Sequence, residues 1–177
     1  MKKILFIYIC FISSFITSFA FANNKIATLN FEYIFNNTKS YNSFLITLNS
    51  YKKELENLIN DRENNLFEMK NDLESLKLLA TDDEINKTTI SYNQKVQVLM
   101  KDIEIINNNM SLNLNNNQKI LKKNIAQISQ IIAEENSIEL ILDQNQYFIS
   151  SSKIDISDKI IDILNDRVIT FKLDKIK

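Results

Sequence analysis

The 177-residue sequence contains no glycine, no proline, no histidine and no tryptophan. Without glycine the chain cannot build a phosphate-cradling loop, a dinucleotide-binding turn or a nucleophile elbow, because each needs a backbone conformation that glycine alone adopts readily. Without histidine it lacks the commonest metal ligand and the commonest general base. We therefore predict that the protein is not an enzyme, that it needs no cofactor, and that it has no catalytic or metal-ligating residues.

The N-terminal segment 1–22 has the three parts of a secretory signal peptide. Lys2 and Lys3 precede an apolar run over 4–12, and the segment ends on Ala20 and Ala22, the small-residue pattern of a cleavage site. The apolar run is shorter than the ~20 residues that a bilayer-spanning helix needs. The sequence thus predicts cleavage after Ala22, a periplasmic protein, and no stable insertion into the membrane after cleavage.

The single cysteine and the net charge set further limits. Cys10 lies in the predicted leader, so disulfides cannot form in the mature chain that begins at Asn23. That mature chain carries 19 Lys and Arg against 22 Asp and Glu, a formal net charge of −3. Proteins that bind nucleic acids usually concentrate basic residues on one surface, so this balance predicts no nucleic-acid partner. Without disulfides, stability must come from packing or from oligomerisation.

Two long segments have the hydrophobic spacing of coiled-coil helices. Apolar residues recur at alternating steps of three and four over 41–79, and again over a second segment that runs toward 135. Between the two, Thr81 and Glu84 form a capping-box pattern, which is typical of a helix start. The segment 41–136 is therefore predicted to be an antiparallel helical hairpin.

Asparagine is abundant and is interleaved with helically spaced Ile and Leu. Because glycine is missing, we expect asparagine to take the left-handed backbone positions. Asn113 and Asn117 fall at seam positions of the second helix, where a polar residue fixes register and lowers stability. Tyr41, Tyr51 and Tyr92 fall on the seam side as well, which favours packing over a platform for stacking a ligand.

Short strand-like segments flank the hairpin. Residues 25–30 predict a strand, followed by a brief helix over 31–35. After the hairpin, the segment 138–150 predicts a β-hairpin, with Asp143 or Asn145 supplying the turn.

The C-terminal part predicts one more helix and a tail. Asp155–Asp158 has the pattern of a helix cap, and Ile160, Ile161 and Leu164 follow at helical spacing. From Arg167 onward the chain alternates weakly through three apolar residues, Ile169, Phe171 and Leu173. This tail is interpreted as either an extra strand or a frayed end.

The predicted fold class is α+β, a small β-rich body with a long protruding antiparallel helical hairpin. Residues 23–40 form the first part of the body, and residues 137–177 form the second part, with the β-hairpin, helix and tail. A body of this size buries too little apolar surface to be stable alone, so we expect it to oligomerise.

Four features of the sequence occur together: the leader, the opening strand Lys25–Asn30, the long hairpin and a closing block. That block comprises Ile138–Asp143, Tyr147, Ile154–Asp158 and Ile160–Asn165. In these features the chain resembles the Skp/OmpH family of periplasmic outer-membrane-protein chaperones.

The resemblance implies a homotrimer in which the bodies associate and three helical hairpins, or tentacles, surround a cavity. Unfolded outer-membrane proteins would be held in that cavity without ATP, and no catalytic residue would be needed. Well-known members of the family are basic, whereas this mature chain is acidic, so we assign no lipopolysaccharide-binding site. The sequence does not identify the client-binding residues.

A second hypothesis remains open, because a structural coiled-coil spacer or adaptor of the cell envelope would show the same heptads. A fixed partner and indifference to unfolded proteins would favour this alternative. Retention of an unfolded barrel protein in solution would favour the chaperone.

Overall fold

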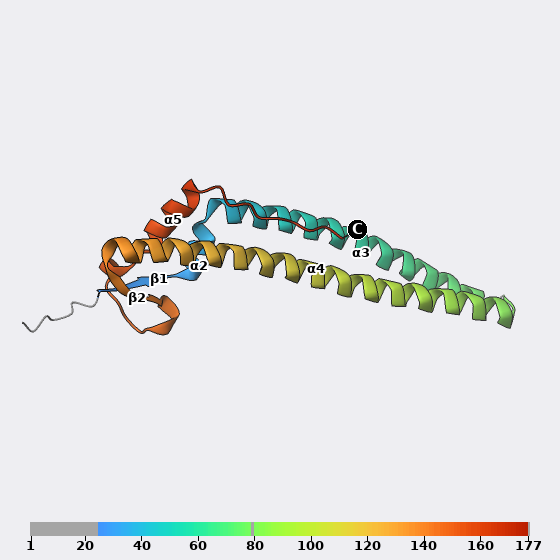
Figure 1. Ribbon diagram of the computed structural model, residues 1–177. Coiled ribbons are helices and arrows are strands. Elements are labelled where there is room, and N and C mark those ends of the chain that lie inside the picture. Colours follow the sequence, from blue (N-terminus) through green and yellow to red (C-terminus); the bar gives the residue numbers. More distant parts are fainter. Residues whose placement is uncertain (1–24, 79, 177) are drawn as a thin grey trace, which may run out of the picture.

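The computed structural model describes residues 25–78 and 80–176, so the predicted leader with Ala20 and Ala22 lies outside the described residues. Figure 1 shows a small body at one end and a long helical hairpin that projects from it. The body contains β1 (Lys25–Leu29), α2 (Phe31–Asn37), β2 (Ile138–Asp143) and α5 (Ser157–Asp166). The hairpin consists of α3 (Lys39–Leu76) and α4 (Asp82–Asn136).

The hairpin confirms the two predicted long helices. At about 1.5 Å per residue, α3 spans about 57 Å and α4 about 82 Å. The predicted capping box opens α4: Glu84 Oε2 accepts hydrogen bonds from the Thr81 backbone N–H at 3.0 Å and from the Thr81 hydroxyl at 2.8 Å. These bonds hold the pKa of the Glu84 carboxyl below its ordinary value. Among the described residues, no helix combines the length and apolar character needed to cross a membrane.

The two strands form a parallel pair, in which Ile26 lies opposite Leu140 and Leu29 lies opposite Asp143. Parallel strands need a long crossover connection, and here the connection is α2 together with the whole hairpin. On the other side of β1, Thr28 makes an isolated parallel bridge with Asp155, and the Thr28 carbonyl accepts a hydrogen bond from the Ile156 N–H at 2.9 Å. The sheet therefore joins the chain segment before the hairpin to the chain segment after it.

The hydrophobic core lies where α2, α5 and the base of the hairpin meet. Ile34 of α2, Ile125 and Ile128 of α4, and Ile160 and Leu164 of α5 are fully buried. The N-cap position of α5 is Ile156, which provides no side-chain cap bond. The residue before it, Asp155, accepts the Ser157 N–H on its Oδ1 at 2.8 Å. The Ser157 hydroxyl in turn accepts the Asn30 N–H at 2.9 Å, which ties α5 to the end of β1.

The predicted β-hairpin over 138–150 is wrong. Only 138–143 is a strand; it pairs with β1, and residues 144–146 form a 3₁₀ turn in place of the expected hairpin turn. Phe148 and Ile149 are fully exposed or nearly so. The described residues are thus mostly helical with a two-stranded parallel sheet, and the body is less rich in strands than the sequence predicted.

The tail is also different from both predicted forms. Residues 167–176 are neither strand nor frayed end; they run in extended conformation along the hairpin (Figure 1). The predicted alternation nevertheless appears in the burial, since Ile169, Phe171 and Leu173 are half-buried against the core while Thr170 and Lys172 are exposed. Burial in the tail therefore alternates from one residue to the next, as in a β-strand, although the tail pairs with no strand among the described residues.

The expectation that asparagine takes the left-handed positions is wrong for the described residues. Ser137, directly after α4, is the residue with positive φ among them, at 54°. Its N–H donates to the carbonyl of Ala133 and so caps the helix before the chain enters β2. A residue with a Cβ costs about 1–2 kcal/mol in this conformation, because the Cβ crowds the following carbonyl.

We predict that Ser137→Gly raises the free energy of unfolding by roughly 0.5–1 kcal/mol, since glycine removes this crowding at some cost in chain entropy. Thermal unfolding at a fixed protein concentration measures the change. Ser111→Gly is the matched control: Ser111 is exposed inside α4, and glycine there should lower stability by roughly 0.5 kcal/mol. Equal destabilisation by both variants would contradict the prediction.

Candidate functional site

The candidate site is the groove between α3 and α4 that the tail occupies. The tail runs antiparallel to α4, since Lys172 contacts Asn117 and Asp174 contacts Asn113. Its apolar face packs on α3, where the Phe171 ring lies 5.4 Å from the Tyr41 ring and 5.9 Å from the Phe44 ring, centre to centre. Burial raises the pKa of the Tyr41 phenol, although a hydrogen bond with Gln118 acts in the opposite direction.

Asn113 and Asn117 bind the tail through its backbone. Asn117 Oδ1 accepts the Lys172 N–H at 3.0 Å, and Asn117 Nδ2 donates to the Lys172 carbonyl at 2.7 Å. One turn away, Asn113 Oδ1 accepts the Asp174 N–H at 2.7 Å, and Asn113 Nδ2 donates to the Asp174 carbonyl at 3.0 Å. Asn109 Nδ2 adds a second bond to that carbonyl, at 3.0 Å. Asn113 and Asn117 each use the carboxamide twice, with Nδ2 as the donor and Oδ1 as the acceptor.

These two asparagines are almost completely buried, with 3% and 2% of their surface exposed. A buried carboxamide without partners would destabilise the fold by roughly 1–3 kcal/mol, but here the tail satisfies it. Their neighbours complete the network, because Asn113 Nδ2 also donates to the Asn109 carbonyl and Asn117 Nδ2 to the Asn113 carbonyl. The predicted seam asparagines are thus buried as expected, but their partner is the tail.

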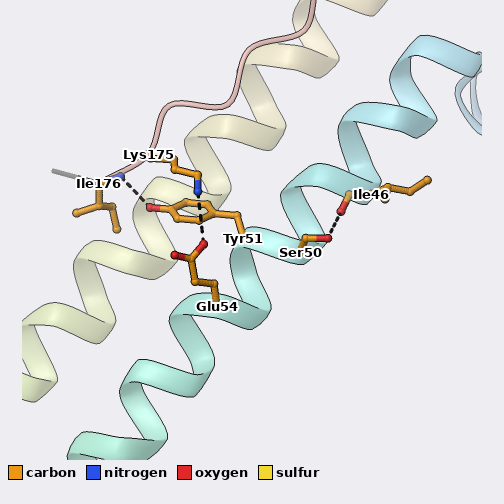
Figure 2. Close-up of polar contacts among 6 residues, drawn as sticks. All are labelled: Ile46, Ser50, Tyr51, Glu54, Lys175 and Ile176. Atoms are coloured by element: carbon orange, nitrogen blue, oxygen red, sulfur yellow. Dashed lines mark hydrogen bonds and ion pairs between the residues drawn. The ribbon is translucent and has the colours of Figure 1, made fainter.

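The end of the tail is fixed on α3 (Figure 2). The Ile176 N–H donates to the Tyr51 hydroxyl at 2.8 Å. Lys175 Nζ lies 4.7 Å from the centre of the Tyr51 ring and 3.4 Å from Glu54 Oε2. Tyr51 was expected to be a packing residue; it is buried, and it also holds the end of the tail.

Beyond Ile176, the last described residue of the tail, the groove continues toward the hairpin tip. A cavity of about 380 Å³ lies next to Ile176, and its other apolar lining residues are Leu55, Leu58, Ile59, Ile105 and Ile106. A second cavity of about 470 Å³ follows, lined by Leu66, Val98 and Leu99 among others. Arg62 and Asp102 border both cavities and form an ion pair between the helices. The apolar surface between α3 and α4 thus continues past Ile176, and the Arg62–Asp102 ion pair crosses it.

The hairpin also carries large apolar side chains on its solvent-facing surface. These residues lie on both helices and in the connecting turn, and each exposes half or more of its surface: Ile46, Leu58, Phe67, Leu78, Ile90, Val98, Met100 and Leu112. They are interleaved with Lys, Asp and Glu residues of both signs. Such a surface offers many weak apolar and charged contacts, which suits a binder of varied partners better than a binder of one.

No group of three or more potential metal ligands occurs among residues 25–78 and 80–176. The sequence missed Asn109 and the role of Tyr51, and it assigned Asn113 and Asn117 to the helix seam alone. The signal that could have found them is their spacing, since Asn109, Asn113 and Asn117 recur at every fourth position. The matching signal in the tail is the alternation of apolar residues at Ile169, Phe171 and Leu173.

The comparison with known families assigns the chain. The sequence model of the family described as "Outer membrane protein (OmpH-like)" matches residues 25–164, so this chain belongs to the OmpH family of outer-membrane-protein chaperones and is not an enzyme. The match ends before the tail. No curated protein matches the chain.

Among solved structures, the chain is similar to a protein from Caulobacter crescentus CB15 whose crystal structure is described as that of an OmpH-like outer membrane chaperone. The TM-score is 0.76 at 11% sequence identity, and the likeness covers 88% of this chain and 93% of that chain. The two proteins therefore share the fold: a small body with a long helical hairpin.

We predict that Asn117→Ala releases the middle of the tail, because the Lys172 N–H and carbonyl lose their partner. Hydrogen exchange at the Lys172 amide should become fast, and stability should fall by about 1–3 kcal/mol. Asn124→Ala is the matched control, since Asn124 Nδ2 donates to the Ile120 carbonyl of its own helix. Slow exchange at Lys172 in the Asn117 variant would contradict the prediction.

Proposed function

We propose that this chain is an ATP-independent periplasmic holdase, which binds unfolded outer-membrane proteins between the hairpins of a homotrimer and prevents their aggregation. Membership of the OmpH family supports a chaperone of outer-membrane proteins. The observation that carries the holdase mechanism is the hairpin itself, which projects from the body and exposes large apolar side chains among charges of both signs. A holdase acts by mass action on the unfolded state, so it needs no chemical step.

The body supports the proposal that the chain oligomerises. A two-stranded sheet is only marginally stable alone. Near β2, Leu140 exposes about half of its surface, and Phe148 and Ile149 expose almost all of theirs. Exposed apolar residues that form one patch are typical of a protein–protein interface, and we propose that these three lie in the interface of the trimer. In a trimer that buries this face, the three hairpins would extend from one central body around a shared cavity.

The charge of the chain limits the proposed partners. The mature chain is acidic overall, and the hairpin tip carries Asp72, Glu74, Asp82, Asp83 and Glu84. We therefore propose that the protein recognises its clients mainly by apolar contacts. We assign no site for lipopolysaccharide. Neither nucleic acid nor a cofactor belongs to the proposal.

The test is light scattering on a sizing column with the mature chain, residues 23–177, alone and after dilution with a urea-unfolded outer-membrane barrel protein. We expect a trimer that co-elutes with soluble client. A chain that leaves the client to aggregate would overturn the holdase and favour the alternative, a coiled-coil spacer of the envelope. Phe148→Asp should break the trimer, whereas Asn93→Asp, on the exposed surface of α4, should leave it intact.

We also expect export with cleavage after Ala22, since a periplasmic chaperone must leave the cytoplasm. Intact-mass measurement on protein from the periplasmic fraction should give a chain that begins at Asn23. Ala22→Lys places a charge at the cleavage position and should leave the precursor uncut. Asn24→Ser, on the mature side, is the control and should be processed normally. Normal processing of the Ala22 variant would contradict the assigned site.

A further inference from the structure

The groove between α3 and α4 recognises the tail by features that many polypeptides share. The bonds from Asn113 and Asn117 reach only the backbone N–H and carbonyl groups of Lys172 and Asp174. The side chains of these two tail residues are exposed. A segment with different residues at the exposed positions would make the same bonds.

The spacing of the two chains explains why these bonds can form. Residues four apart on an α-helix are separated by about 6.0 Å along its axis. Residues two apart in an extended chain are separated by about 6.4–6.8 Å, and their N–H and carbonyl groups point to the same side. Asn117 and Asn113, four positions apart on α4, therefore bind tail residues that are two positions apart, through backbone groups alone. Asn109 adds a second bond to the Asp174 carbonyl.

The apolar side of the groove limits which extended segments can bind there. Ile169, Phe171 and Leu173 pack toward the hairpin, and Phe171 lies against Tyr41 and Phe44. The groove thus accepts apolar side chains at alternate positions and leaves the positions between them to solvent. Backbone bonds that supply affinity, with pockets for alternate side chains, are the general mode by which extended peptides are bound.

The groove extends past the last described residue of the tail, Ile176. The two cavities beyond Ile176, of about 380 and 470 Å³, continue its apolar lining toward the hairpin tip. The family match covers residues 25–164 and so does not include the tail. Apolar surface of the groove is therefore available beyond the residues that bind the described part of the tail.

We infer that this groove binds an extended segment of an unfolded client with apolar residues at alternate positions, and that the tail is its intramolecular occupant. The inference rests on the proposed holdase function. The strands of transmembrane β-barrels have this dyad alternation, apolar toward lipid and polar toward the lumen. The tail, VITFKLDKIK over 168–177, has the same alternation over Ile169, Phe171 and Leu173. A client strand displaces the tail, and the tail covers the groove when no client is present.

The first test uses the full mature chain with a weakened tail, Phe171→Ser combined with Leu173→Ser. A fluorescein-labelled peptide with the sequence of residues 168–177 is the probe, and its anisotropy is measured. We expect the weakened-tail variant to bind this peptide at least tenfold more tightly than the wild type does, because its own tail competes less. Val168→Ser is the matched control, since Val168 is almost fully exposed, and it should bind like the wild type.

Two further peptides test the mode of binding. A peptide that is N-methylated at the positions of Lys172 and Asp174 lacks the two N–H donors and should lose at least tenfold in affinity. A peptide of the same composition, with its apolar residues made contiguous, should also bind weakly. Equal binding by wild type and weakened-tail variant, or undiminished binding of the methylated peptide, would overturn the inference and leave the tail as a structural strap.

The second test uses the unmodified chain and so does not depend on how the variant folds. A synthetic transmembrane strand of an outer-membrane barrel is added, and hydrogen exchange is followed at the Lys172 and Asp174 amides. Displacement of the tail should speed their exchange at least tenfold at saturating peptide, with amides in the core of α5 unchanged. Unchanged exchange at saturating peptide would overturn the inference.

These results are separable from those of the holdase test. If the client stays soluble but the tail is not displaced, the proposed holdase function is supported and this groove is excluded as the client-binding site. Tail displacement by the strand peptide, with aggregation of the full client, would support the groove and overturn the holdase.

Discussion

The parallel pairing of β1 with β2 is the constraint on which the rest of the structure depends. The strands flank the helical hairpin in the sequence, so their register brings the two ends of the hairpin together. The same strand β1 bonds on its other side to the segment before α5, which places α5 on α2 and on the base of α4. Because α5 ends beside the start of α3, the tail that follows it begins at the base of the groove. A two-stranded sheet thus sets the position of every other described element.

The tail and the hairpin stabilise each other by two different kinds of contact. On the α3 side the contacts are apolar and aromatic, and they extend the body core outward along the hairpin. On the α4 side they are hydrogen bonds to two buried carboxamides, whose Nδ2 groups also donate within α4 and whose Oδ1 atoms accept the N–H groups of the tail. Loss of the tail would therefore remove the donors that these two oxygens accept. Polar residues in a helix seam were expected to lower stability, but here the third chain segment removes that penalty.

Much of the fold could be predicted from the sequence, because the elements with strong periodicity are local. The two long helices, the capping box at Thr81 and the buried face of α5 follow from spacing and caps. The β-hairpin prediction failed because Phe148 and Ile149 read as strand residues, although in the single chain they have no neighbouring strand and face solvent.

The candidate site could be predicted only in part. The alternation of the tail and the seam positions of Asn113 and Asn117 were both visible in the sequence. Their pairing depends on two segments more than fifty residues apart, and no local signal connects them. The left-handed Ser137 was missed for a related reason: the need for that conformation arises where α4 must turn into β2, which is a property of the assembled body.

The unbroken length of α4 has a mechanical consequence. This helix runs from the hairpin tip to Asn136, and one residue separates it from β2. Its C-terminal turns, from Leu121 onward, are packed in the body core, and the part from Asp82 to Ile120 projects over about 58 Å. A rotation of about 10° at the base of this part would carry the tip through about 10 Å. A small rotation in the body would thus move the tip of the hairpin by a much larger distance, while each helix stays intact.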